Sequence, residues 1–267
     1  MSYHARYGLD FNPFIKNSKD TLIETTENKE VVYRLKYLLN TKGFGVITGA
    51  SGRGKTTTVR HWANSLNPSL CKVIYIPLST VTVIEFYRQL AESLGLEARY
   101  RKSENFRMIQ AEITRLAIEK RITPVIIIDE ANYISSGILN DLKMMFNFEK
   151  DSKDMAVILL VGLPQLNNTL RLASNEPLRQ RIVMNYHLEH LSKEEGLEYI
   201  MDALKAACSR QPVFDEAALE AILNTAGGVI RLINKICDIC LFIGNNKKAP
   251  TITTEIVMSA VNEIELD

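Results

Sequence analysis

The chain has 267 residues, 46% of them hydrophobic, and a formal net charge of +1 at pH 7. This length suits one large domain, or one domain with a small second one, and the apolar content is enough for a packed core. The near-neutral charge excludes a uniformly basic surface, so a footprint for nucleic acid must be local, and no apolar run reaches the roughly 18 residues of a membrane span.

The N-terminal sequence MSYHARYGLDFNPF contains no continuous apolar segment, and therefore no secretory signal peptide is predicted. We interpret residues 1–23 as an arm in which Tyr7, Phe11 and Phe14 lie around a proline turn. Four cysteines in a chain of this length are too few for a disulfide framework and favour a reducing compartment. We therefore expect a soluble, cytoplasmic protein that does not enter a membrane.

Strand and helix patterns alternate over residues 24–190, which we predict to be an α/β domain. Continuous apolar segments indicate strands that are buried on both faces of a parallel sheet. The strands are predicted over 43–48, 72–77, 123–131, 156–162 and 183–188. Helices are predicted over 28–40, 56–66 and 80–94. A further helix is predicted to begin at an N-cap at Ser103, and another to lie around 139–146.

The strand pattern stops after Leu191. Cys237 and Cys240 form a C-x-x-C motif in one of the helical patterns that follow. Because no second Cys or His pair lies at ligand spacing and LINKICDICLFI forms an apolar helix face, we interpret both as core residues rather than metal ligands. Residues 191–267 are predicted to form a small helical lid, with helices over 192–208, 215–226, 229–244 and 254–266.

The sequence GASGRGKT, between a predicted strand and a predicted helix, matches the phosphate-loop pattern G-x-x-x-x-G-K-[ST]. Glycine adopts the backbone dihedral angles that direct N–H groups at phosphate oxygens, and the N-terminus of the following helix favours an anion. Lys55 is predicted to bind the β- and γ-phosphates, and Thr56 to bind Mg²⁺. A chance glycine-rich turn is disfavoured by the flanking strand and helix. The predicted nucleotide-binding residues are Gly49, Ala50, Ser51, Gly52, Arg53, Gly54, Lys55, Thr56 and Thr57.

A second motif, VIIIDE, ends a predicted buried strand. Asp129 is predicted to hold Mg²⁺ through water, and Glu130 to act as the general base on the attacking water. An acidic pair alone would be compatible with an ordinary surface turn. Its place at the end of a buried strand after a phosphate loop predicts NTP binding and hydrolysis.

The transition state of phosphoryl transfer also needs positive charge at the γ-phosphate. Arg179 and Arg181 lie in PLRQRI before the fifth strand, and Arg231 lies in GGVIRLIN at the start of a predicted helix. Each arginine alone is compatible with a surface or salt-bridged residue. Their positions relative to the phosphate loop make them candidates for catalysis.

The order of these motifs, preceded by YGLDFNPF, resembles that of the ExeA/TniB-type AAA+ ATPases over nearly the whole chain, most of all the stand-alone members encoded beside DDE transposases. The resemblance implies a P-loop AAA+ module with a five-stranded parallel sheet and a helical lid, with ATP and Mg²⁺ bound between them. It implies a homo-oligomer, either a ring or a helical filament. Arg179 or Arg181 would be the arginine finger that completes a neighbour's site, and Arg231 would be the lid sensor.

The chain departs from the family pattern at three places. Leu163 stands where relatives usually carry a polar Gln, which leaves the first sensor open, with Gln165 and Asn167 as substitutes. Asn132 replaces the usual Gln after the acidic pair, and Ile230 stands where Pro is common.

The element between the second strand and the acidic strand often meets DNA in this class. Here it contains Arg99, Arg101 and Lys102, with Tyr100 among them. A contact with the DNA backbone and a solvated basic loop are both compatible with this pattern.

Three functions remain open, and the first is the main prediction. It is a DNA-transposition helper that assembles on duplex DNA without strong sequence preference when ATP-bound, recruits a DDE transposase, and disassembles after hydrolysing ATP to ADP and phosphate. The second is a secretion-system assembly ATPase of the ExeA type, ranked lower because such relatives generally add a membrane span and a cell-wall-binding domain after the lid. The third is a nucleotide-gated adaptor with negligible turnover.

Overall fold

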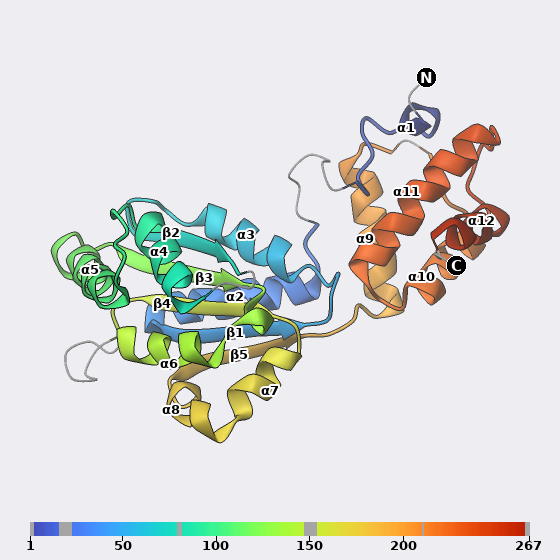
Figure 1. The fold of residues 1–267 in the computed structure, drawn as a ribbon. Helices are drawn as coiled ribbons and strands as arrows, with labels where there is room; N and C mark the ends of the chain where they lie inside the picture. Colours follow the sequence, from blue (N-terminus) through green and yellow to red (C-terminus); the bar gives the residue numbers. More distant parts are fainter. Residues whose placement is uncertain (1–2, 16–22, 79–81, 147–153, 210, 265–267) are drawn as a thin grey trace. The chain divides into compact units, whose positions relative to one another are not determined.

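Five parallel strands form one sheet in the order β2-β3-β4-β1-β5 (Figure 1). The structure is a computed structural model that describes residues 3–15, 23–78, 82–146, 154–209 and 211–264. The predicted five-stranded parallel sheet is confirmed. Its strands are β1 Gly43–Gly49, β2 Cys71–Pro77, β3 Thr123–Asp129, β4 Val157–Gly162 and β5 Ile182–Leu188.

The described chain divides into two units, each with its own core. We call the first the α/β unit, which comprises Glu30–Ser51 and Lys55–Leu188. We call the second the helical unit, which comprises the chain up to Lys29, the segment Gly52–Gly54, and the chain from Glu189 onward.

The central strands are buried on both faces because their side chains alternate between two layers of core. Ile126 and Ile128 of β3 pack in one layer, while Val125 and Ile127 pack in the other. All four side chains are fully buried. This arrangement explains why the strand reads as an unbroken apolar run in the sequence.

Most helices of the α/β unit lie where the sequence predicts them. An exception is the start of α5, where the N-cap is Arg101 and not Ser103. The N–H groups of Glu104 and Asn105 both bond the Arg101 carbonyl, so the first turn already includes Ser103. The helices are α2 Thr26–Thr41, which begins in the helical unit, α3 Lys55–Ser65, α4 Val83–Ser93, α5 Lys102–Thr114 with the π-helical turn η1 Arg115–Glu119, α6 Ser136–Met145, α7 Gln165–Arg171 and α8 Glu176–Arg179.

The short helices α7 and α8 are absent from the sequence prediction. Helix α7 buries only Leu166 and Leu170, and α8 buries only Leu178. A single pair of apolar residues spaced i, i+4 is too short a signal for a helical period.

In the helical unit the N-terminal arm packs into the same core as α9–α12. Tyr7 is fully buried there, and Gly244 of α11 leaves the space for its ring, because a Cβ at Gly244 would lie 2.3 Å from the Tyr7 hydroxyl oxygen. Cys237 and Cys240 are buried in this core. The helices are α1 Tyr3–Arg6, α9 Lys193–Ala206, α10 Glu216–Ala226, α11 Ile230–Asn246 and α12 Thr254–Ile264.

Within the described ranges, no helix combines the length and the apolar character that a membrane span requires.

Candidate nucleotide-binding site

The phosphate loop leaves β1 at Gly49 and enters α3 at Lys55. Strand β1 is buried along its whole length, so the start of the loop is held firmly by the sheet. The Lys55 ammonium donates to the carbonyl oxygens of Gly49 (2.8 Å) and Ala50 (2.9 Å). Phosphate oxygens would be stronger acceptors than these neutral carbonyls, because hydrogen bonds between charged groups are roughly twice as strong.

The tip of the loop, Gly52–Gly54, belongs to the helical unit. The Gly52 carbonyl accepts a hydrogen bond from the Arg231 backbone N–H at 3.1 Å. Gly52 has a φ of 80°, and a Cβ there would lie 2.8 Å from Cβ of Arg231. Glycine is therefore required at this position both by the dihedral angle and by the space. Arg53 is buried, and its guanidinium contacts the His190 ring.

A buried carboxylate lies at the end of β3 beside the first turn of α3. Asp129 accepts hydrogen bonds from the Thr56 hydroxyl at 2.9 Å, from the Tyr75 hydroxyl, and from the Glu130 backbone N–H at 2.9 Å. Asp129 is only 5% exposed. A hydroxyl and a carboxylate in contact offer the hard oxygen ligands that Mg²⁺ prefers. Thr56 and Asp129 therefore fit the metal role predicted for them.

Tyr75 reaches Asp129 through the strand register. It lies opposite Ile127 in the β2–β3 pairing, which places it diagonally beside the side chain of Asp129 on the same sheet face. Burial, followed by the hydrogen bond to Asp129, raises the pKa of Tyr75 well above its usual value. The hydroxyl therefore stays protonated and serves as a donor to the carboxylate.

Glu130 takes a left-handed backbone conformation, with φ 56° and ψ 35°. Such a conformation is uncommon for a residue other than glycine and often occurs at active sites. It turns the chain sharply after β3, so Asp129 is buried whereas the next side chain is exposed. An exposed carboxylate directly after a buried one is suited to contact a water molecule.

Asn132 connects the ends of two neighbouring strands. Its side-chain oxygen accepts the Leu163 backbone N–H at 3.0 Å, just after β4. A Cβ at Gly162 would lie 3.0 Å from the Asn132 backbone nitrogen, so glycine permits the close approach. The asparagine that departs from the family pattern therefore has a structural role of its own here.

Asn167, one of the two possible substitutes for the first sensor, donates to the Thr48 hydroxyl at 3.0 Å. The same hydroxyl lies 3.0 Å from Nδ1 of His187 on β5. Gln165, the other substitute, is exposed at the first turn of α7.

The candidate catalytic arginines Arg179 and Arg181 lie at the end of α8 and just after it. The exposed Arg179 donates from Nη1 to the Arg171 carbonyl at 3.0 Å, and the partly buried Arg181 donates from Nη1 to the Lys143 carbonyl at 2.9 Å. Arg231 lies in the first turn of α11. The contacts of Arg179 and Arg181 lie within one chain. Their action on a neighbouring copy therefore stays a prediction.

The loop before α5 is built on a buried asparagine. Asn105 accepts the Arg99 backbone N–H at 2.8 Å and donates to the Arg99 carbonyl at 2.9 Å. Asn105 is fully buried, whereas the Tyr100 side chain is 93% exposed. A fixed backbone thus presents an aromatic ring to solvent between two arginines.

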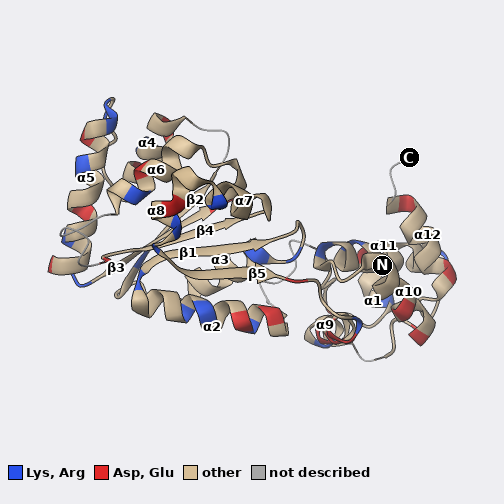
Figure 2. Cartoon of the chain, turned by 90° about the horizontal axis from the view of Figure 1, so that it is seen from below, with Lys and Arg blue, Asp and Glu red and all other residues tan. Residues whose placement is uncertain are grey.

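The charges of this segment are partly neutralised. Lys102 lies 2.6 Å from a carboxylate oxygen of Asp141, and Arg99 lies 3.4 Å from one of Glu97. Figure 2 shows Lys and Arg interspersed with Asp and Glu along α5. Arg101 is exposed and has no ion pair with another described residue.

Sequence reasoning missed Tyr75, Asn105 and the Thr48–His187–Asn167 cluster. A tyrosine inside the apolar run KVIYIP was the only local signal for Tyr75. Thr48 is separated from Asn167 and from His187 by more than a hundred residues, so only the fold brings it to them.

Comparison with known proteins gives similarities to a domain family and to a curated protein. Residues 38–170 match the model of a protein family described as an AAA domain. General secretion pathway protein A from Aeromonas hydrophila is 31% identical over 243 residues, which cover 88% of this chain and 44% of that protein. The chain thus spans less than half the length of this curated relative.

Solved structures share the fold at low sequence identity. Cdc6p from Pyrobaculum aerophilum gives a TM-score of 0.72 at 16% identity, covering 94% of this chain and 70% of its own. ORC2 from Aeropyrum pernix gives a TM-score of 0.71 at 17% identity, and the match covers 95% of this chain and 71% of the ORC2 chain. RuvB from Thermotoga maritima gives a TM-score of 0.58 at 19% identity, and the match covers 96% of this chain and 74% of the RuvB chain. The fold of this chain is a P-loop AAA+ fold.

Proposed function

Because the chain has a P-loop AAA+ fold, we propose that it is an ATPase that binds ATP with Mg²⁺ and hydrolyses it to ADP and phosphate. The observation that carries the proposal is the contact between Thr56 of the phosphate loop and the buried Asp129, at 2.9 Å. It would join the two halves of a magnesium–nucleotide site from separate elements, next to the exposed Glu130.

In this proposal each side chain has one role. Lys55 exchanges its two carbonyl partners for phosphate oxygens, and Thr56 and Asp129 hold Mg²⁺, the latter through water. Bound Mg²⁺ would neutralise charge on the phosphates. Glu130 takes a proton from the attacking water. Arg179 or Arg181 of a neighbouring copy would supply positive charge at the γ-phosphate.

We propose further that nucleotide state controls the assembly of this protein with its partners, and that the process is of the secretion type. The support is the similarity to general secretion pathway protein A, which extends over 88% of this chain. This relative favours the secretion hypothesis over the transposition hypothesis that the sequence motifs placed first.

The transposition helper remains a second candidate because of one feature of the structure. The loop at Arg99–Arg101 presents an exposed aromatic ring between two arginines on a backbone held by Asn105. Arginine side chains contact phosphates and aromatic rings stack on bases, so this loop is suited to DNA. In that case duplex DNA and a DDE transposase would be the partners.

The ATPase proposal is tested by steady-state turnover with Mg²⁺ and by binding of a fluorescent ATP analogue. We expect Glu130→Gln to retain binding and lose turnover, and Lys55→Ala to lose binding. Glu92→Gln, an exposed carboxylate on α4, is the matched control and should behave as the unmodified chain. Equal turnover in Glu130→Gln and the unmodified chain would support the adaptor hypothesis instead.

The two partner hypotheses are separated by fluorescence anisotropy of a random-sequence duplex with no nucleotide, with a slowly hydrolysed ATP analogue, and with ADP. Cooperative binding only with the ATP analogue would favour transposition. We then expect Arg101→Gln to weaken binding to all DNA sequences. It should also reduce the slope of log K against log salt concentration by about 1, as expected for the loss of one phosphate contact. Absence of binding in every state would leave the secretion hypothesis.

A further inference from the structure

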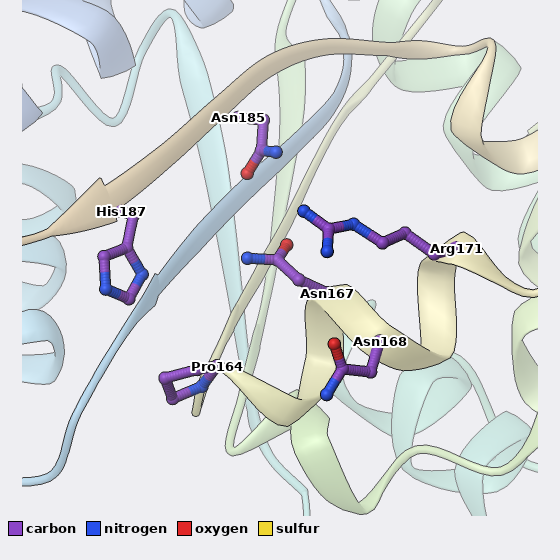
Figure 3. Close-up of a pocket in the computed structure, with 6 residues that line it drawn as sticks. All are labelled: Pro164, Asn167, Asn168, Arg171, Asn185 and His187. Carbon is purple, nitrogen blue, oxygen red and sulfur yellow. The ribbon is translucent and has the colours of Figure 1, made fainter.

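A polar pocket of about 450 Å³ lies in the α/β unit between α7 and the edge strand β5. Its volume lies within the range of small-molecule sites. Figure 3 shows side chains from α7 and from β5 pointing toward the same space. The lining residues are Pro164, Asn167, Asn168, Arg171, Asn185 and His187. Of these, Asn167 is also a candidate for the first sensor of the proposed ATPase site.

Side-chain contacts at the back of this pocket connect His187 to Thr48 and Asn167. The Thr48 hydroxyl accepts a hydrogen bond from the Asn167 amide at 3.0 Å. Its own single proton is then available for Nδ1 of His187, 3.0 Å away. In the tautomer whose Nδ1 accepts from Thr48, the Nε2–H of His187 is a hydrogen-bond donor.

The remaining polar groups add donors and no negative charge. The lining contains one guanidinium and three asparagine amides but no Asp or Glu. Arg171 has no ion pair, and its guanidinium has no hydrogen bond, within the part of the chain that the structure describes. Figure 3 shows its guanidinium directed toward Asn167 and Asn185.

We propose that this pocket binds a small oxyanion, a carboxylate or a phosphate group. The Arg171 guanidinium would supply the charge and a planar pair of N–H donors, which matches the geometry of both groups. Nε2 of His187 and the asparagine amides would supply neutral donors. The inference does not rest on the proposed ATPase function, because the charge comes from Arg171, which has no role in that proposal.

The test is an NMR titration of the histidine imidazole Cε1–H signals with two probes, inorganic phosphate and succinate. His187→Gln identifies the His187 signal among the four histidines. Because Thr48 directly precedes the phosphate loop, the titration is done with the Lys55→Ala chain as well as the unmodified chain. Sodium chloride at matched ionic strength and the uncharged diamide succinamide are the ligand controls.

We expect a saturable shift of the His187 signal with one or both anions in both chains, and none with the ligand controls. Arg171→Gln should weaken the binding roughly tenfold, as for loss of one charged hydrogen bond. Arg88→Gln, which removes an exposed arginine on α4, should leave the binding unchanged. The anion that binds more tightly identifies the ligand class.

Three results would overturn the proposal: no saturable shift with either anion, a shift that sodium chloride reproduces, or a shift that Arg171→Gln leaves intact. A shift that disappears in Lys55→Ala would also overturn it, because the anion would then act from the phosphate loop. Circular dichroism checks that each variant is folded.

Discussion

At the scale of single residues, the carboxylate of Asp129 shows how far the chemistry depends on its neighbours. Its oxygens accept hydrogen bonds from the Thr56 and Tyr75 hydroxyls and from the Glu130 N–H, and these contacts orient the carboxylate. Tyr75 would not bind the metal itself. It would position the carboxylate that is proposed to hold the metal, while the Arg60 guanidinium lies over the Tyr75 ring at 5.4 Å.

We predict that Tyr75→Phe raises the Mg²⁺ concentration needed for half-maximal ATPase activity by roughly tenfold, because loss of an outer-shell partner loosens the ligand. The measurement is turnover against Mg²⁺ concentration at saturating ATP. Tyr133→Phe is the control, since this tyrosine is 59% exposed. The positioning role is ruled out if Tyr75→Phe and Tyr133→Phe have the same Mg²⁺ requirement.

The cysteines of the C-x-x-C motif allow a second residue-scale prediction. Burial raises the pKa of the Cys240 thiol to about 12 and the pKa of Cys237 well above its ordinary value. A raised pKa lowers the thiolate fraction at any given pH, and the thiolate is the reactive form. Both cysteines should therefore resist iodoacetamide at pH 8 in the folded protein.

Mass spectrometry of the alkylated peptides checks this expectation. Cys208 is exposed and should be modified first, which provides an internal control. Alkylation of Cys237 or Cys240 at a rate similar to that of Cys208 would contradict the assignment of these two residues to a closed core. No group of three or more metal-ligating side chains exists among the described residues.

At the scale of elements, the packing of the N-terminal arm on α11 depends on a glycine inside the helix. Helix propensity alone predicts that Gly244→Ala stabilises the protein by about 1 kcal/mol. A Cβ there would instead lie 2.3 Å from the Tyr7 hydroxyl oxygen and 2.4 Å from Cδ1 of Ile252. We predict a net destabilisation of about 1–3 kcal/mol, because overpacking a closed core costs more than the propensity gains.

Urea denaturation of the Gly244→Ala chain and of the unmodified chain shows directly whether the substitution raises or lowers the free energy of unfolding. Asn246→Ala, at an exposed position of the same helix, should change the free energy of unfolding by less than about 0.5 kcal/mol. Combining Tyr7→Leu with Gly244→Ala should recover part of the free energy of unfolding that Gly244→Ala loses. A Gly244→Ala chain more stable than the unmodified one would show that the arm does not pack on α11 in solution.

At the scale of the whole molecule, we propose that a second copy of the chain completes the ATPase site. Arg179 is exposed at the end of α8, whereas Arg181 is partly buried and bonded to the Lys143 carbonyl. Either arginine would act on a neighbour's nucleotide, as the family resemblance implies. Turnover per chain should therefore rise with protein concentration.

We predict that alanine at the arginine that acts as the finger lowers turnover by on the order of 10³-fold while nucleotide binding is retained. Arg179→Ala and Arg181→Ala are compared across a range of protein concentrations, with thermal melting to separate a loss of stability. Arg88→Ala is the control. If neither variant lowers turnover beyond the control, the positive charge comes from another residue or is not required.

The sequence by itself determined the features whose signals are local. The continuous apolar strands, the long helices and the phosphate loop each depend on residues that are adjacent or spaced by one helical turn. Their patterns can therefore be recognised in the linear sequence. Lys55, Thr56, Asp129 and Glu130 could be proposed for this reason, although their roles await the turnover experiment.

Only the tertiary structure decided which distant side chains meet. Tyr75 reaches Asp129 because β2 and β3 pair in one register, and Thr48 meets His187 because β1 lies beside β5. Tyr7 is buried because α11 has a glycine at position 244. No periodic pattern encodes such contacts, because they arise from the order of strands in the sheet and the packing of separate elements, and these are properties of the folded chain as a whole.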